Sequence, residues 1–265
     1  MTDVLVILLT ALLTPAAVMV VAALIARAQG RVAVVDVAWG AGFVLVALVT
    51  AVVGQALDAG DPARRWLVTA LVAAWGLRLA WHIRKRAVGH GEDPRYEKLL
   101  GGPLPEVGLG LAVRKVFVVQ GVAMAIISLP VAVGAVSEVA WWPLVWVGVA
   151  MWAVGLVFET VGDAQLAAYK RDPDRTPVMD RGLWAWTRHP NYFGDACVWW
   201  GLWLAGGLAS GWLSGLLTVV APVAMTYFLV FATGARLLEQ SMMKRSGYPE
   251  YAARTSMFFP LPPRR

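Results

Sequence analysis

Charged residues and cysteines are scarce in this chain of 265 residues. Charged residues make up 15% of the sequence and hydrophobic residues 59%, which is far more apolar than a soluble domain needs to fill its core. The single cysteine, Cys197, excludes an intramolecular disulfide framework and argues against a cysteine-rich metal site. The composition therefore predicts a protein whose main solvent is a lipid bilayer.

Several enzyme signatures are also missing. The sequence contains no GxGxxG unit, no phosphate-binding P-loop, no GxSxG nucleophile and no HExxH pair. Its three histidines, His82, His90 and His189, lack the close spacing of metal ligands. We therefore expect no nucleotide site of the soluble α/β type and no bound metal.

Long apolar runs dominate what is present. A bilayer core about 30 Å thick needs about 20 mostly apolar residues per helix. Such runs cover residues 4–25, 34–53, 66–83, 116–136, 142–161, 196–208 and 213–235, the sixth being short. No linker, charge block or repeat divides the chain. We expect residues 1–265 to form one all-α integral membrane domain with about seven transmembrane helices.

Lysine and arginine are segregated between the connections. They are concentrated after the third, fifth and seventh runs, whereas the opposite connections hold Asp58, Asp61, Arg64 and Arg65, then Glu138, then an uncharged stretch. By the positive-inside rule, the N-terminus lies outside and the C-terminus is cytoplasmic, which requires an odd number of helices. The net charge of +6 is thus explained without a nucleic acid partner, and we expect no obligate protein partner.

The most distinctive motif lies just before the sixth run. Residues 188–195 read Arg-His-Pro-Asn-Tyr-Phe-Gly-Asp, which brings Arg188, His189, Asn191 and Asp195 to a membrane boundary. Polar side chains there are costly unless they face a cavity or one another. A plain helix start at Pro190 is the simpler alternative. The fifth run ends in Glu159 and Asp163, whose i, i+4 spacing puts both carboxylates on one side of a helix and favours a polar pocket.

A second group lies in the first half of the chain. Asp36, three residues before Trp39, enters the second run, and an intramembrane carboxylate is a functional hypothesis by default. Its alternative is a structural ion pair with Arg78 or Arg84. On the third run, Arg78 and His82 are spaced i, i+4, and the following loop carries Asp93 and Tyr96.

These residues resemble the membrane steroid 5-alpha-reductase-like family, which includes bacterial members of unassigned substrate and is related to the sterol C14 and C24(28) reductases. The resemblance is strongest over residues 150–260. Isoprenylcysteine methyltransferases are more distantly related and share the Arg-His-Pro-x-Tyr-x-Gly element. Asn191 and Asp195 look like the reductase version, and Glu239 is followed by Gln240 where the methyltransferases tend to have paired acids.

The resemblance implies an NADPH-dependent membrane reductase that transfers hydride to a polarised C=C bond of a lipid or steroid-like substrate. The implied cofactor-binding residues are Glu159, Asp163, Lys170, Arg171, Arg188, His189, Asn191, Tyr192, Asp195, Arg236, Glu239 and Tyr248. Cations suit the phosphates of the cofactor, while acids and amides suit its hydroxyl and carboxamide groups.

At the substrate end, the family's acid on the second span and Tyr on the third are matched by Asp36 and His82, which we expect to be catalytic. Trp39, Arg78, Asp93 and Tyr96 are expected to bind substrate. An S-adenosylmethionine-dependent membrane methyltransferase and a non-catalytic lipid-binding membrane protein are the alternatives. We expect a multi-pass location in a cell membrane, the bacterial inner membrane.

Overall fold

A computed structural model describes residues 2–232 and 234–263, with side chains from residue 5 onward. The described residues are helical or irregular, and none of them forms a strand. The chain divides into two compact units, each built from two stretches of sequence: residues 1–145 with 202–221, and residues 146–201 with 222–265. The single domain expected from the sequence stays a prediction, and each unit is described by itself.

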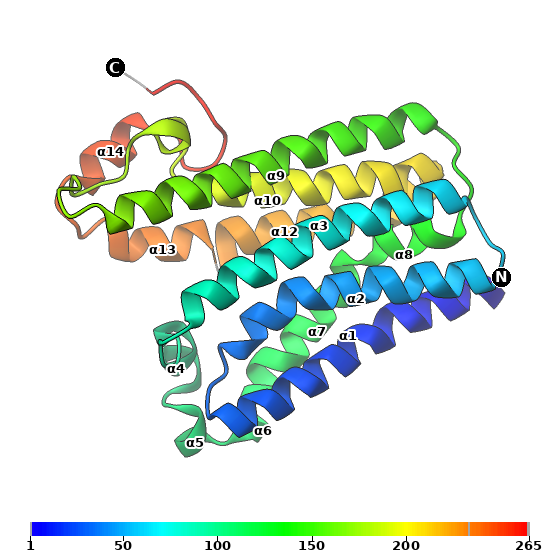
Figure 1. Ribbon diagram of the computed structural model, residues 1–265, viewed down its shortest axis with the longest axis horizontal. Helices are drawn as coiled ribbons and strands as arrows, with labels where there is room; N and C mark the ends of the chain where they lie inside the picture. Colours follow the sequence, from blue (N-terminus) through cyan, green and yellow to red (C-terminus); the bar gives the residue numbers. More distant parts are fainter. Residues whose placement is uncertain (1, 233, 264–265) are drawn as a thin grey trace. The chain divides into compact units, whose positions relative to one another are not determined.

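The first unit is a bundle in which α2 packs between α1 and α3, with α7 and α8 alongside. Figure 1 shows the short helices α4 to α6 gathered at the C-terminal ends of α1 and α3. Its elements are α1 (Thr2–Gln29), α2 (Val34–Ala56), α3 (Pro62–Ala87), α4 (Pro94–Leu100), α5 (Leu104–Val107), α6 (Leu109–Ala112), η1 (Val113–Phe117), α7 (Val118–Ile127), α8 (Leu129–Val136), η3 (Trp203–Gly207), η4 (Leu208–Ser210) and α11 (Trp212–Thr218).

Glycines let α2 and α3 touch at the backbone. A Cβ added to Gly40 would lie 2.5 Å from the carbonyl oxygen of Gly76, and one added to Gly76 would lie 2.6 Å from that of Gly40. In a bilayer, helix association depends on such close packing, because lipid is as apolar as the side chains. This contact brings the first turn of α2, with Asp36, into a rigid frame.

Two buried arginines hold the other end of α3. Arg64 is fully buried, and its guanidinium donates to the carbonyl oxygens of Gly134 (2.7 Å) and Ser137 (2.5 Å) at the end of α8. Arg65 donates to the carbonyl oxygen of Ala135 at 2.8 Å. The last carbonyls of a helix have no partner within it, so these side chains cap α8. Both residues were counted from the sequence among the charges of a connecting loop, whereas here they lie inside the protein.

The second unit contains most of α9 (Trp142–Arg171), α10 (Pro190–Leu202) and α12 (Val220–Tyr227), with η2 (Gly182–Ala185), η5 (Phe228–Ala232), α13 (Ala235–Met242) and α14 (Tyr248–Arg254). Glycines again bring two backbones together, since a Cβ on Gly194 of α10 would lie 2.5 Å from both the Gly155 oxygen and the Glu159 nitrogen of α9. Figure 1 shows α13, α14 and the loop before α10 gathered at the C-terminal end of α9.

Six helices of the described chain are long and apolar enough to cross a membrane: Leu5–Gln29, Val34–Ala56, Pro62–Ala87, Leu109–Ile127, Trp142–Arg171 and Trp212–Met242. They confirm a multi-pass helical membrane protein. The seventh helix, expected at residues 196–208, is helical from Pro190 to Ser210 but is not among the six. Asn191 and Asp195 make its first half polar. The count of seven, and the orientation that depends on it, stay predictions.

Replacing Arg64 with lysine should destabilise the protein. A lysine ammonium cannot reproduce the planar guanidinium that donates to the carbonyl oxygens of both Gly134 and Ser137. Each buried acceptor left without a donor costs about 1–3 kcal/mol. The control is Arg84→Lys at the exposed C-terminal end of the same helix, where a change below about 0.5 kcal/mol is expected. Thermal unfolding in detergent measures both; equal melting temperatures would contradict the capping role.

Candidate functional sites

The first polar cluster lies in the first unit and consists of Asp36, Asp93, Arg95, Tyr96 and Gln120; we call it the Asp36 cluster. The Tyr96 hydroxyl donates to Asp36 Oδ1 at 2.5 Å, and Arg95 Nη2 lies 3.3 Å from Asp36 Oδ2. Both oxygens of the carboxylate are therefore bound by residues of α4 and its start. The Asp36 side chain is 23% exposed, so the cluster lies at the boundary of the protein interior.

Local sequence explains how α4 presents these groups. Asp93 accepts a hydrogen bond from the Arg95 backbone nitrogen at 2.8 Å and so caps the helix, Pro94 occupies its first position, and Gly101 ends it in a left-handed conformation with φ of 88°. The Asp93 carboxylate also binds the Arg95 guanidinium at 2.8 Å. Arg95 and Tyr96 are thus held on the first turn of α4, facing Asp36.

The electrostatics of the cluster act on Tyr96 and on Asp93. Burial and the nearby Asp36 charge raise the pKa of Tyr96, so its phenol stays protonated at neutral pH. Burial alone would raise the pKa of Asp93, but the hydrogen bonds and charge of Arg95 outweigh it and hold the pKa below its usual range. The cluster can donate a hydrogen bond or a proton to a polar group that reaches Asp36.

Gln120 is a member that sequence reasoning missed. Its amide Nε2 donates to the Tyr96 hydroxyl at 3.3 Å, which is consistent with the phenolic hydrogen being directed at Asp36. Its Oε1 is buried without a hydrogen-bond partner among the described residues. A glutamine alone in the apolar run of residues 116–127 is a signal that could have identified it.

The structure brings together three of the predicted substrate-end residues: Asp36, Asp93 and Tyr96. The described contacts of the Asp36 carboxylate come from Arg95 and Tyr96. His82 and Arg78 lie on α3, and Trp39 packs edge-on against Phe43 with ring centroids 5.0 Å apart. The roles predicted for His82, Arg78 and Trp39 stay predictions.

The second cluster lies in the second unit and is centred on Glu239, with Arg188, His189, Tyr192 and Tyr248; we call it the Glu239 network. Arg188 binds the carboxylate with two nitrogens, at 2.6 and 2.9 Å, and His189 Nε2 lies 3.1 Å from Oε1. Tyr248 donates to the same oxygen at 3.4 Å, and the His189 ring stacks on Tyr192 with centroids 5.4 Å apart. These predicted cofactor residues bind one another.

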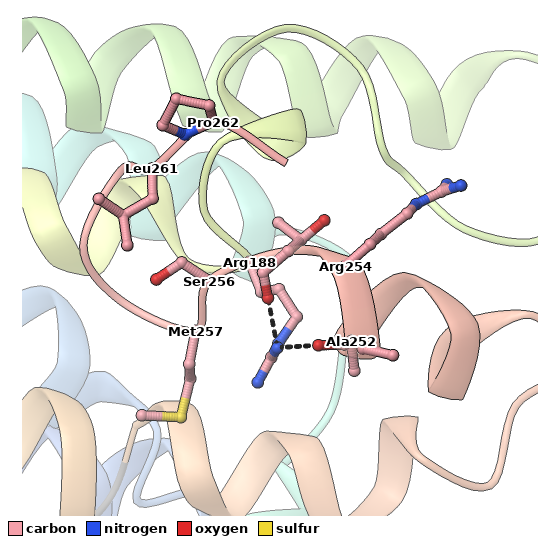
Figure 2. Close-up of a pocket in the computed structure, with 9 residues that line it drawn as sticks. Arg188, Ala252, Arg254, Ser256, Met257, Leu261 and Pro262 are labelled. Carbon is pink, nitrogen blue, oxygen red and sulfur yellow. Dashed lines mark hydrogen bonds between the residues drawn. The ribbon is translucent and has the colours of Figure 1, made fainter. Parts of the chain in front are cut away.

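The third Arg188 nitrogen ties this network to the C-terminal segment. Its Nη1 donates to the carbonyl oxygens of Ala252 (2.7 Å) and Thr255 (2.6 Å), as Figure 2 shows. Burial disfavours the guanidinium charge, but Glu239 outweighs it and raises the pKa of Arg188. A pocket of about 330 Å³ lies beside this side chain. It is lined by Arg188, Ala252, Ala253, Arg254, Thr255, Ser256, Met257, Leu261 and Pro262.

Four more predicted cofactor residues meet where α9 and α10 touch. Asn191 Nδ2 donates to Asp163 Oδ1 at 3.2 Å, and Glu159, Asp163 and Asp195 are each at most 9% exposed. Because Gly194 contacts the Glu159 backbone, the carboxylates of both helices are concentrated at this crossing. Of the predicted cations, Lys170 and Arg171 are exposed at the end of α9, and the Arg236 guanidinium lies 4.5 Å from the Phe231 ring centroid.

An all-helical fold with six apolar helices and polar clusters at helix ends defines a multi-pass membrane protein. Residues 22–255 match the model of the family described as "Protein of unknown function (DUF1295)", and the chain belongs to this family. Comparison with curated proteins and with solved structures gave no match. The match covers the Asp36 cluster, the α9–α10 crossing and the Glu239 network.

Removing the Glu239 carboxylate should destabilise the second unit. In Glu239→Ala, the mostly buried Arg188 loses its counterion, and breaking a buried ion pair from one side costs on the order of 3 kcal/mol. Glu250→Ala, an exposed carboxylate on α14, is the matched control and should change stability little. The measurements are thermal unfolding in detergent and the protease sensitivity of residues 243–263. Unchanged values for both variants would remove Glu239 as the organising residue.

Proposed function

We propose that this protein is an NADPH-dependent membrane reductase that acts on a polarised C=C bond of a lipid or steroid-like substrate. The observation that carries the proposal is the 2.5 Å hydrogen bond between Tyr96 and Asp36. Adding hydride to a conjugated C=C bond moves its electron pair toward the carbonyl oxygen and leaves a carbon that must gain a proton. A protonated phenol beside a carboxylate is suited to stabilise that charge and to supply that proton.

The same pair argues for reduction over methyl transfer. Methyl transfer attaches a methyl group to a nucleophile and creates no atom that must gain a proton, so it has no need of a proton donor at the substrate's polar end. The Glu239 network does not distinguish the two classes, because Arg188, His189 and Glu239 are expected around either cofactor and here bind one another. The reductase is therefore the better supported of the two enzyme classes.

The residues of the second unit fit NADPH, which when bound would supply the hydride. The buried Glu159, Asp163 and Asp195 offer acceptors for ribose hydroxyls, and Asn191 offers an amide. The exposed Lys170 and Arg171 would hold phosphate groups, since Arg and Lys recognise phosphate through charge-assisted hydrogen bonds. The proposal includes a cell-membrane location with the C-terminus in the cytoplasm, where NADPH is available.

NADPH should raise the melting temperature of the detergent-solubilised protein, and S-adenosylmethionine should not, because a ligand stabilises the fold that binds it. Asn191→Ala should weaken NADPH binding by about 1–3 kcal/mol. Ser241→Ala, an exposed polar position on α13, is the matched control and should bind like the parent. Stabilisation by S-adenosylmethionine alone would favour the methyltransferase, and stabilisation by neither would favour a non-catalytic protein.

Tyr96→Phe and Asp36→Asn should retain NADPH affinity but lose turnover by about 100-fold or more, because both groups are assigned to the transition state of substrate reduction. NADPH consumption with a panel of α,β-unsaturated lipid and steroid ketones measures this. In sealed vesicles, only those with the cytoplasmic face outward should consume added NADPH. Loss of NADPH affinity in folded Asp36→Asn would move Asp36 to the cofactor site.

A further inference from the structure

Glu92, just before α4, has a role that the proposed function does not use. Its carboxylate accepts hydrogen bonds from the backbone nitrogens of Val32 and Ala33, at 2.9 Å for Ala33, and from its neighbour Asp93 at 3.0 Å. Val32 and Ala33 immediately precede α2, where backbone N–H groups have no partner within the helix. Ala33, at the N-cap position, has no side chain able to cap. Glu92 therefore caps α2 from about 60 residues away in sequence.

A second contact joins the same two segments. Arg31 Nη1 donates to the carbonyl oxygen of His90 at 2.8 Å. On the first turn of α2 itself, Asp36 accepts hydrogen bonds from Tyr96 and Arg95. The segment after α3 is thus attached to the beginning of α2 at three successive points, and the last of them occupies the carboxylate of the proposed site.

Glycines bound this segment on both sides. Gly89 and Gly101 have positive φ values of 79° and 88°, and a Cβ built on Gly89, Gly91 or Gly101 would meet nothing within 4 Å. The ends of the segment are therefore conformationally permissive and lie in open space. Residues 89–102 form a unit that is anchored through Glu92, Arg95 and Tyr96. Near its C-terminal end, Leu100 is buried and Lys115 donates to the carbonyl oxygen of Leu99, so the end at Gly89 and Gly91 is the more loosely connected one.

Residues of this segment occupy both oxygens of the Asp36 carboxylate, which links the segment to the proposed site. Tyr96 binds Oδ1 and Arg95 binds Oδ2, so the polar end of a ligand has to displace one of them to reach the carboxylate. Arg95 is 55% exposed and lies on the solvent side of the cluster. Displacing the buried Tyr96 from Asp36 requires movement of α4, and Glu92 attaches the residues just before α4 to the beginning of α2.

We propose that Glu92 is a positioning residue: by capping the beginning of α2 it holds Arg95 and Tyr96 on Asp36, and residues 89–102 act as a lid that opens to admit the polar end of an amphipathic ligand to Asp36 and then closes to bring Tyr96 back against it. This inference rests on the proposed function only in taking Asp36 as the place where that polar end binds. The hydrogen bonds of Glu92 to Val32 and Ala33, which we call the latch, do not depend on which reaction follows.

The lid can be followed by a distance measurement in the full-length protein. With Cys197→Ser as background, Ala28→Cys on α1 and Lys98→Cys on α4 place spin labels on two exposed positions of the first unit. Pulsed electron paramagnetic resonance should give one narrow distance distribution for the latched parent. Glu92→Ala should broaden it or add a longer distance.

Two further variants make the test specific. Glu92→Gln keeps an oxygen that accepts from N–H, so it should restore most of the narrow distribution. Glu97→Ala removes an exposed carboxylate of α4 that has no described hydrogen bond to α2, and it should match the parent. If Glu92→Ala folds poorly, Arg31→Ala, which loses the contact with His90 and a local hydrogen bond to Gln29, should broaden the distribution to a smaller extent.

A parent-like distribution in the variants that fold, whether Glu92→Ala or Arg31→Ala, would overturn the latch. The distance measurement needs no NADPH and no substrate. Its result on the position of α4 therefore stays valid even if the protein does not bind NADPH. If turnover is found, Glu92→Ala should lower it and Glu92→Gln should recover it. Full turnover in Glu92→Ala, with a broadened distribution, would show that Glu92 does not position Tyr96 for the reaction.

Discussion

Charged side chains inside this protein have to find their partners within the chain, because lipid offers neither donors nor acceptors. Arg64 donates to carbonyl oxygens at the end of α8, and Glu239 pairs with Arg188 and His189. Glu92 accepts hydrogen bonds from backbone nitrogens at the beginning of α2. Each contact joins segments at least 50 residues apart. Satisfying buried charge therefore determines which helix ends meet, and the polar clusters described above follow from it.

Close helix packing provides the frame on which these contacts depend. The Gly40–Gly76 contact and the Gly155–Gly194 contact each bring two backbones together without intervening side chains. The first lies one turn from Asp36 and the second lies beside Glu159 and Asp195. Glu159 and Asp195, beside the second contact, are buried, so their charges have a larger effect than they would in solvent.

The two units carry chemically different clusters. The Asp36 cluster combines a carboxylate, a phenol and an amide in a chain of hydrogen bonds, and Gln120 Oε1 has no hydrogen-bond partner within the described part of the chain. The Glu239 network is an ion pair whose members satisfy each other and bind the C-terminal segment. The proposal of proton chemistry on a ligand concerns the first cluster, whereas the second ties the His-Pro-Asn-Tyr motif to α13 and the C-terminal segment. Within the motif of residues 188–195, Arg188 and His189 belong to the Glu239 network, whereas Asn191 binds Asp163 where α9 and α10 touch.

The sequence by itself determined the class of fold and several of the polar residues that matter. Apolar run length predicted helices, since spanning a bilayer sets their length, and i, i+4 spacing placed Glu159 and Asp163 together because helix geometry is local. The partner of Asp36, the burial of Arg64 and the capping by Glu92 were decided only by the tertiary structure. In the sequence, Glu92 and Tyr96 belong to a polar segment whose local pattern is weak, and Arg64 looks like an ordinary loop charge. Their roles depend on segments about 60 to 70 residues away, and which distant groups meet is determined by how the helices pack, which no local propensity encodes.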